Sequence, residues 1–300
     1  IHSGIEISPL MMPLRGEPYF FPDLPQSEYY GLPPAFADSL PDSFGSSIID
    51  AYLQTIGLQR TEITPLDRLA YLGRRGVGAL SYEPAHSLGR KDSSALDMRC
   101  LAEEARAALN GELARTNGAD ALRHILRVGS SAGGAQAKAV VGWKRDTDEF
   151  VLGDGDLPDG FEHWIIKFTP QEYPWRGEKE YDIYLKARNA GIDISESCLY
   201  ELDGIKHFMT SRFDRDGSVR HHVQTLSAIA HYPTSVPIAF RTYERIFAAA
   251  EELRLGYDAK EELFRRMAFN VAVGECDDHT KNFSFMLKES GDWSLAPAYD

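Results

Sequence analysis

The feature that most constrains this chain is a cluster of polar residues in the run CDDHTKNFS near its carboxyl end. Asp277, Lys281 and Asn282 follow an amphipathic helical pattern and precede a strand-like segment, so they are expected on one short loop. Asp300, in the run APAYD, adds a second carboxylate. Carboxylate and carboxamide oxygens are the ligands that Mg²⁺ prefers, with phosphate oxygens completing its coordination. The pattern therefore predicts a magnesium-dependent phosphoryl-transfer site.

The spacing within this loop assigns roles to its residues. Asp277 and Asn282 are five positions apart, the spacing of the catalytic base and the metal-binding Asn in protein kinases. Asp277 is therefore predicted to orient the acceptor hydroxyl and take its proton, and Lys281 to stabilise charge on the transferred phosphoryl group. His279 is expected beside the nucleotide with a structural hydrogen-bonding role, and Asp278 is expected to face solvent.

The composition is that of an ordinary globular protein that can bury real cores. Of 300 residues, 43% are apolar and 26% are charged, and this length favours about two domains. The net charge of −13 argues against a chain that binds nucleic acid over its whole surface. Three scattered cysteines are too few for a disulfide framework or a zinc site. No apolar run approaches the roughly 18 residues of a membrane span. A cytoplasmic protein without membrane contact is expected, as a fragment trimmed at both ends.

The order of the expected elements divides the chain into three parts. Residues 1–115 are rich in Pro and Gly, with helices expected over SSIIDAYLQTIG and DMRCLAEEARAALN. In residues 116–212, strands are expected over RHILRVG, KAVVGWK, EFVLGD and HWIIKF, then the helix KEYDIYLKARNAG and a hairpin. Residues 213–300 turn helical and lead into the DDHTKN loop. The prediction is an α/β (α+β) protein with an N-terminal mixed domain and a bilobal kinase-like core, whose C-terminal lobe is mostly helical.

A glycine-rich loop stands between two of these expected strands. In the run GSSAGG, Gly129, Gly133 and Gly134 would let backbone N–H groups approach phosphates closely, with Ser130 and Ser131 as hydroxyl donors. The run is neither G-x-G-x-x-G nor a Walker A loop, so an ordinary hairpin turn stays open as an alternative.

Lys167 lies inside the apolar strand HWIIKF. A lysine in this setting either extends to an exposed edge or meets an anion, such as the α- and β-phosphates of a nucleotide. Glu180, near the start of the next expected helix, is a candidate carboxylate partner for it.

In this order, the segments resemble the HipA family of bacterial serine/threonine kinase toxins. The similarity runs along most of the chain, through the runs ISPLMMPLR, YYGLPPAFADSLPDSFG, SAGGAQAK, WIIKF, KEY, SRFDR, DDHTKNFS and LAPAYD. The resemblance implies ATP and Mg²⁺ as cofactors, with Lys167 as the ATP lysine and Asp277 as the base. It also implies Asn282 and Asp300 as the metal ligands, and Phe213 near the adenine.

The resemblance further implies a regulatory site and partners. Ser131 matches the family's autophosphorylation serine, although Ser130 is adjacent. A phosphate there would add nearly two negative charges beside the ATP phosphates, and repulsion would expel the loop and switch the kinase off. The implied partners are a HipB-like helix-turn-helix antitoxin, operator DNA through that antitoxin, and a substrate among translation components such as aminoacyl-tRNA synthetases.

Three other functions stay open at this point. The chain could be a catalytically silent co-repressor that acts with a DNA-binding antitoxin, although its intact set of site residues argues against this. It could also be a small-molecule kinase, which uses similar loop chemistry. A hydrolytic metal site formed by Asp277, Asp278 and His279 is weaker still, because no further ligands lie at metal spacing nearby.

Overall fold

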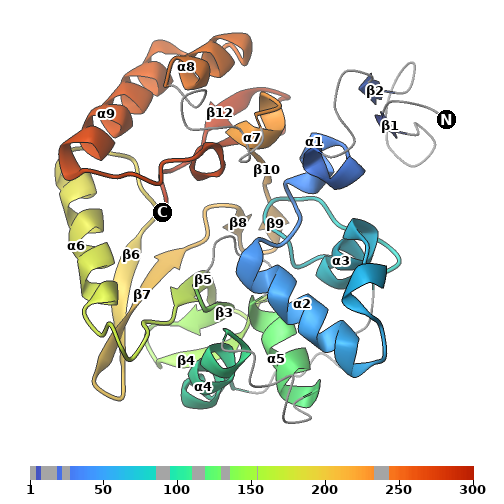
Figure 1. The fold of residues 1–300 in the computed structure, drawn as a ribbon. Helices are drawn as coiled ribbons and strands as arrows, with labels where there is room; N and C mark the ends of the chain where they lie inside the picture. Colours follow the sequence, from blue (N-terminus) through green and yellow to red (C-terminus); the bar gives the residue numbers. More distant parts are fainter. Residues whose placement is uncertain are drawn as a thin grey trace.

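The fold is taken from a computed structural model, which describes residues 5–7, 19–21, 28–85, 95–109, 119–129, 136–153, 155–232 and 243–300. Figure 1 shows α8 and α9 at one end of the molecule and a five-stranded sheet toward the other, with the carboxyl terminus between them. Two hydrophobic cores underlie this division, one around the sheet and one under α8 and α9. None of the described helices is long and apolar enough to cross a bilayer.

The N-terminal region is mostly short helices. Its elements are β1 (Ile5–Ile7), β2 (Tyr19–Phe21), η1 (Glu28–Gly31), α1 (Pro34–Ala37), α2 (Ser43–Thr55), η2 (Arg60–Glu62) and α3 (Pro65–Leu72). Helix α2 forms where expected because Ile48, Ile49, Tyr52 and Leu53 bury one helical face. The chain leaves α2 through Gly57, whose φ of +95° suits a glycine.

Two further helices, α4 (Met98–Leu109) and α5 (Ala119–Gly129), pack against α2 in the same core. The run RHILRVG was predicted as a strand, and this is wrong, because it lies in α5. Its buried residues include Leu122, Ile125 and Leu126, which have helical spacing. A short apolar run bounded by turn signals, such as the glycine-rich run that follows this one, cannot be assigned to strand or helix from periodicity alone.

The five-stranded sheet is antiparallel throughout, in the order β4-β3-β5-β7-β6. Its strands are β3 (Lys138–Lys144), β4 (Glu149–Leu152), β5 (Glu162–Lys167), β6 (Ser197–Leu202) and β7 (Ile205–Ser211). Helix α6 (Arg176–Asn189) connects β5 to β6 and packs on β6 and β7 (Figure 1). The register places Lys138 opposite Lys167, so both side chains project from the same face of the sheet.

The C-terminal part combines a small sheet with helices. Its elements are β8 (Arg215–Asp216), β9 (Val219–Arg220), β10 (His222–Thr225), α7 (Leu226–Ile229), α8 (Tyr243–Glu252), α9 (Tyr257–Val273), η4 (Thr280–Asn282), β11 (Ser284–Leu287) and β12 (Trp293–Leu295). Strands β10, β11 and β12 form an antiparallel sheet, and the loop between α9 and β11 contains η4. The division at residues 115 and 212 stays a prediction.

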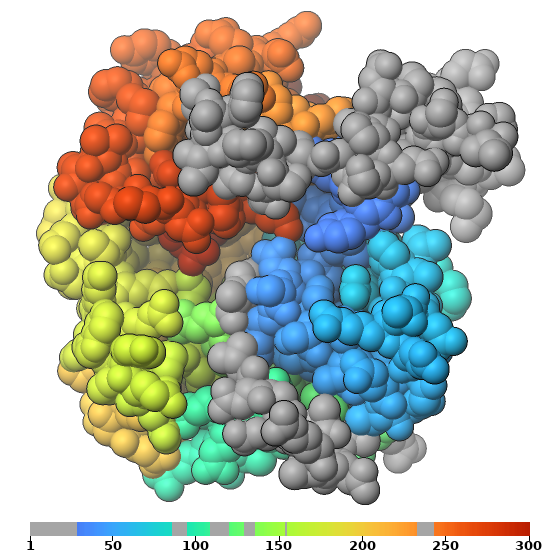
Figure 2. Space-filling model, viewed as in Figure 1, coloured from blue at the N-terminus to red at the C-terminus, as the bar shows by residue number. Residues whose placement is uncertain are grey.

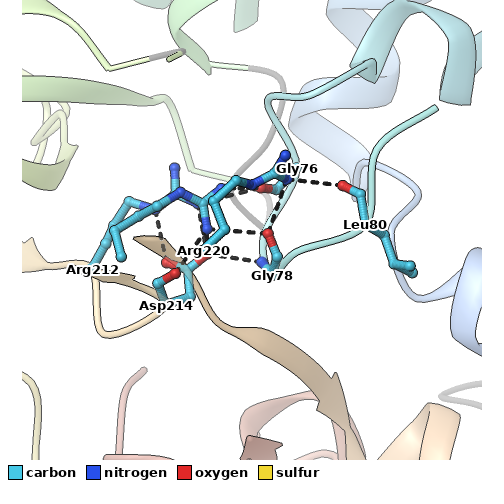
Figure 3. A network of polar contacts seen from close by, with 7 residues as sticks. Gly76, Gly78, Leu80, Arg212, Asp214 and Arg220 are labelled. Atoms are coloured by element: carbon cyan, nitrogen blue, oxygen red, sulfur yellow. Dashed lines mark hydrogen bonds and ion pairs between the residues drawn. The ribbon is translucent and has the colours of Figure 1, made fainter. Parts of the chain in front are cut away.

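A buried ionic network ties the loop after α3 to the turn after β7 (Figure 3). The carboxylate of Asp214 accepts hydrogen bonds from Arg212, from Arg215 at 2.6 Å and from the backbone N–H of Gly78 at 2.8 Å. Both arginines also donate to the carbonyl of Gly76. Burial would raise the pKa of Asp214, but the two guanidinium groups hold it well below its usual range.

Replacing Asp214 with Asn should lower the free energy of unfolding by about 3–5 kcal/mol, because two buried guanidinium groups lose their counter-charge. The side chains of Arg212 and Asp214 are only 2% and 4% exposed, so water cannot replace the missing carboxylate. Urea unfolding at pH 7 measures the change, with exposed Glu289→Gln as the control. A loss no larger than that of the control would contradict this account of the network.

Two buried histidines make the fold sensitive to acid. Burial lowers the pKa of His163 to about 4, and repulsion from Arg212 and Arg215 adds to the effect. Burial also lowers the pKa of His207 to about 4, with a contribution from Arg106, and its Nδ1 accepts a hydrogen bond from the backbone N–H of Thr169.

Stability should therefore fall as the pH is lowered from 7 to 5. The unfolded chain protonates these histidines near pH 6.5 and the folded chain only near pH 4, so their contribution is complete above pH 6.5 and is lost below it. The expected loss is on the order of 1 kcal/mol per histidine per pH unit. Urea unfolding at both pH values tests this, and His207→Gln should reduce the slope. An unchanged slope would count against the assignment.

Candidate active site

A cleft lies between the five-stranded sheet, the η4 loop and the N-terminal region. Figure 2 shows a hollow on this face where the red C-terminal segment, the yellow-green α6 and the blue N-terminal region meet. Its lining includes Lys138, Lys167, Phe213, His279, Lys281, Asn282 and Asp300, together with residues 38–42. Residues predicted from separate parts of the sequence thus face one cavity. The predicted Ser131, Gly133 and Gly134 lie outside the described residues.

Lys167 is held by two carboxylates from different elements. Its Nζ lies 2.6 Å from Oε1 of Glu180 in α6 and also donates to the carboxylate of Asp300. The side chain is 13% exposed. Burial would lower the pKa of Lys167, but Asp300 and Glu180 raise it well above its usual value. Lys167 in turn lowers the pKa of Asp300. Lys167 is therefore a fixed, permanently charged group that faces the cleft.

Lys138 is a second lysine in the cleft, and sequence reasoning missed it. It begins β3 directly after the glycine-rich segment and is 3% exposed. Burial lowers the pKa of Lys138 to about 8, and repulsion from Lys167 adds to the effect, whereas Asp300 opposes it. The signal in the sequence was its position, a lysine at the entry to a strand after a glycine-rich loop. Two cations projecting from one sheet face suit an anion that carries several charges.

The backbone of the η4 loop is fixed by its own hydrogen bonds. The carbonyl of Asp277 accepts from the side-chain amide of Asn282 at 3.0 Å and from the N–H of His279 at 2.8 Å. The N–H of Asp277 donates to Glu275 at 2.7 Å. Because the amide nitrogen of Asn282 is used in this way, its Oδ1 is the atom left to act as a ligand. The carboxylate of Asp277 lies on an exposed residue of the same loop.

Asp278 is partly buried and hydrogen-bonded to helix α8, whereas it was expected from the sequence to face solvent. Its carboxylate accepts a hydrogen bond from the hydroxyl of Tyr243 in α8, and that hydroxyl also accepts from Asn270 at 3.1 Å. Burial raises the pKa of Tyr243, and the bond to Asp278 raises it further. This contact joins residues 35 positions apart and ties the loop to α8.

Tyr299, next to Asp300, connects the two sides of the cleft. Its hydroxyl donates to the carbonyl of Lys281 at 2.6 Å and also bonds to the hydroxyl of Ser284. Its ring stacks on Phe213, with the centroids 5.6 Å apart. Burial raises the pKa of Tyr299, so the phenol stays protonated as a donor. Sequence reasoning singled out only the following residue, Asp300, and missed this aromatic residue.

Lys281 is paired with a residue from the N-terminal region. Its Nζ lies 2.6 Å from Oδ1 of Asp42, although the two residues are 239 positions apart. Burial would lower the pKa of Lys281, but Asp42 raises it above its usual value. Lys281 therefore remains charged at the edge of the cleft.

The residues present fit a hard cation with oxygen ligands. Asn282 and Asp300 both line the cleft, and phosphate oxygens could complete the coordination of a cation held by their side-chain oxygens. Within the part of the chain that the structure describes, no three His, Cys, Asp or Glu residues are grouped to hold a metal ion. A hydrolytic metal site formed by Asp277, Asp278 and His279 is further disfavoured, because the carboxylate of Asp278 accepts a hydrogen bond from Tyr243.

Two family models match this chain. The HipA-like C-terminal domain matches residues 130–300, which is more than half of the chain, and the HipA N-terminal domain matches residues 1–83. The chain belongs to the HipA family. This confirms the relationship that the sequence motifs indicated.

Curated relatives of this HipA-family chain match about half of it. A Haemophilus influenzae protein provisionally named a kinase is 28% identical over 151 residues, which are 46% of this chain and 44% of the relative. A Sinorhizobium fredii protein, also provisionally named a kinase, is 25% identical over 46% of this chain and 36% of its own length. The match thus spans less than half the length of each relative.

A solved structure shows the same fold. The HipA structure from Shewanella oneidensis, in a complex with HipB and operator DNA, superposes with a TM-score of 0.58 at 17% identity. The superposition covers 86% of this chain and 64% of that chain. The predicted mixed α/β fold with a HipA-like core is thereby confirmed.

Replacing Lys167 with Met should raise the pKa of Lys138 from about 8 toward the value of about 10.4 for a free lysine. The substitution removes the nearest like charge and leaves the attraction of Asp300. NMR titration of lysine side chains labelled with ¹³C measures the change, with exposed Lys179 as an internal reference. An unchanged titration of Lys138 would show that the two ammonium groups do not interact.

Proposed function

We propose that this chain is the catalytic part of an ATP- and Mg²⁺-dependent serine/threonine protein kinase. The observation that carries the proposal is the position of Lys167, a charged lysine that lines the cleft and is held between Glu180 and Asp300. In protein kinases, an ion-paired strand lysine contacts the nucleotide phosphates, and an aspartate near the catalytic loop binds the metal. The names of the two curated relatives support the same reaction class.

Nucleotide binding follows from the charges in the cleft. Lys167 and Lys138 would bind the phosphates, and Lys167 would exchange its contact with Asp300 for phosphate oxygens. Asn282 and Asp300 would hold Mg²⁺, which when bound neutralises charge on the β- and γ-phosphates. Phe213, stacked on Tyr299, would pack against the adenine, as its family position predicts.

Transfer would use the exposed carboxylate of Asp277. This group would orient the acceptor hydroxyl and accept its proton as the oxygen bonds to the γ-phosphorus and the bond to ADP breaks. The ammonium of Lys281 would stabilise negative charge on the transferred group. His279 lines the same cleft and begins η4, a place suited to shaping the loop near the phosphates.

Regulation and partners complete the proposal. Autophosphorylation on Ser131 would add negative charge beside the phosphates and switch the kinase off. The HipA structure with the same fold is bound to HipB and operator DNA, which supports a HipB-like antitoxin as partner and indirect contact with DNA. A translation component such as an aminoacyl-tRNA synthetase is the proposed substrate, and the whole would act as the toxin of a toxin–antitoxin pair.

The test is transfer of label from [γ-³²P]ATP with Mg²⁺, with and without bacterial lysate. We expect label on the chain at Ser131 and on a lysate protein. Asp277→Asn and Lys167→Met should each reduce labelling at least 100-fold, because they remove the base and the phosphate-binding cation. Exposed Glu289→Gln serves as the control. Label that persists in Asp277→Asn would rule out the assigned base.

Two outcomes would favour other functions. Operator binding with an antitoxin but no label anywhere would indicate a silent co-repressor. Label on a small metabolite, with no labelled protein, would indicate a small-molecule kinase.

A further inference from the structure

The turn between α1 and α2, residues 38–42, lies in the wall of the cleft. Asp38, Pro41 and Asp42 line it together with Lys167, Lys281 and other residues of the proposed site. This turn belongs to the N-terminal region, whose family model ends at residue 83, well before the sheet and the η4 loop. The cleft is therefore not enclosed by the C-terminal domain alone.

The N-terminal region is fastened to the C-terminal part close to this wall. Asp38 accepts hydrogen bonds from the backbone N–H and the hydroxyl of Thr225, at 2.8 and 2.6 Å. The hydroxyl of Tyr29 donates to the carbonyl of Ser227 at 3.0 Å. Since Thr225 pairs with Ser284 on the strand after η4, these bonds fix the turn relative to the catalytic loop.

Asp42 occupies a position where its carboxylate would ordinarily serve its own helix. It is the N-cap residue of α2, and Asp at this position usually accepts a hydrogen bond from the first helical turn. Here it makes no such bond, and its Oδ1 instead lies 2.6 Å from Nζ of Lys281. The carboxylate thus gives up a local contact and binds a cation on the catalytic loop.

Lys281 is consequently fixed at both ends. Its carbonyl accepts from the hydroxyl of Tyr299, and its ammonium is held by Asp42. The two side chains are 25% and 28% exposed, so the ion pair adds little stability, about 1 kcal/mol or less. Its main effect is on position, because it selects one geometry for a lysine side chain with many rotamers.

We propose that Asp42 is a positioning residue for phosphoryl transfer, which holds the ammonium of Lys281 at the place where charge develops on the transferred group. The N-terminal region would then supply one wall of the active site and a residue that positions a catalytic side chain. This inference rests on the proposed kinase function. It predicts that Asp42 acts through Lys281 and not through the stability of the fold.

The test is a double-mutant cycle on ADP release by the whole chain, with Asp42→Asn, Lys281→Met and the double variant. Asp42→Asn should lower kcat by about 10- to 100-fold, the range expected for a misplaced catalytic group, and change KM for ATP much less. The double variant should be no slower than Lys281→Met alone, because Asp42 has no role once Lys281 is gone. Asp42→Glu, which keeps the charge, should recover part of the lost kcat.

Asp50→Asn is the matched control. Asp50 lies on α2 and is buried, and its carboxylate is 3.0 Å from the guanidinium group of Arg68. Neither residue lines the cleft. Its substitution should lower the melting temperature without changing kcat, whereas Asp42→Asn should lower kcat and shift the melting temperature only slightly.

Three results would overturn the inference. The first is additive losses of kcat in the double variant, and the second is an unchanged kcat in Asp42→Asn. The third is a higher kcat in Asp42→Asn, which would mean that the ion pair blocks the site. Failure of the underlying function gives a different pattern, since a wild-type chain that releases no ADP contradicts the proposed kinase itself. Melting temperatures of the same four proteins report separately on whether the ion pair forms, because only a formed pair gives non-additive shifts.

Discussion

The ammonium group of Lys167 is the point on which the cleft depends. It comes from β5, and its two carboxylate partners come from α6 and from the residue after Tyr299, so one charge joins the sheet, a helix and the C-terminal part. Burial makes such a charge costly, and the two carboxylates offset that cost. The same arrangement keeps Asp300 ionised and lowers the pKa of neighbouring Lys138. The protonation states of the groups that would bind a nucleotide thus depend on one another.

The N-terminal region is built into this arrangement. Helices α2, α4 and α5 share a core with the five-stranded sheet, and the Asp214 network binds the loop after α3 to the turn after β7 (Figure 3). Its arginines also reach backbone carbonyls on that loop, including a bond from Arg220 to Leu80 at 2.9 Å. The turn at residues 38–42 is held against the cleft separately, by the two hydrogen bonds that Thr225 donates to Asp38. This is the physical basis for assigning Asp42 a part in catalysis.

The sequence allowed prediction of local features and of the polar groups in the site, but not of how distant segments pair. The amphipathic helices and hairpins followed from periodicity, and Lys167 stood out because a charge in an apolar strand needs a partner. Helix α5 was missed because its apolar run was short. The contacts Asp278–Tyr243 and Asp42–Lys281 join residues 35 and 239 positions apart, which no local pattern encodes. Lys138 and Tyr299 were overlooked because each stands beside a stronger motif and gains meaning only from its burial and contacts.

The most direct test of the account is a crystal structure of the chain with Mg²⁺ and a non-hydrolysable ATP analogue. The account predicts the phosphates against Lys167 and Lys138, the metal on Oδ1 of Asn282 and the carboxylate of Asp300, and the adenine beside Phe213. Lys167 should keep Glu180 and release Asp300 to the metal. A nucleotide bound elsewhere, or bound with the Lys167–Asp300 pair intact and no metal on Asp300, would contradict the central claim.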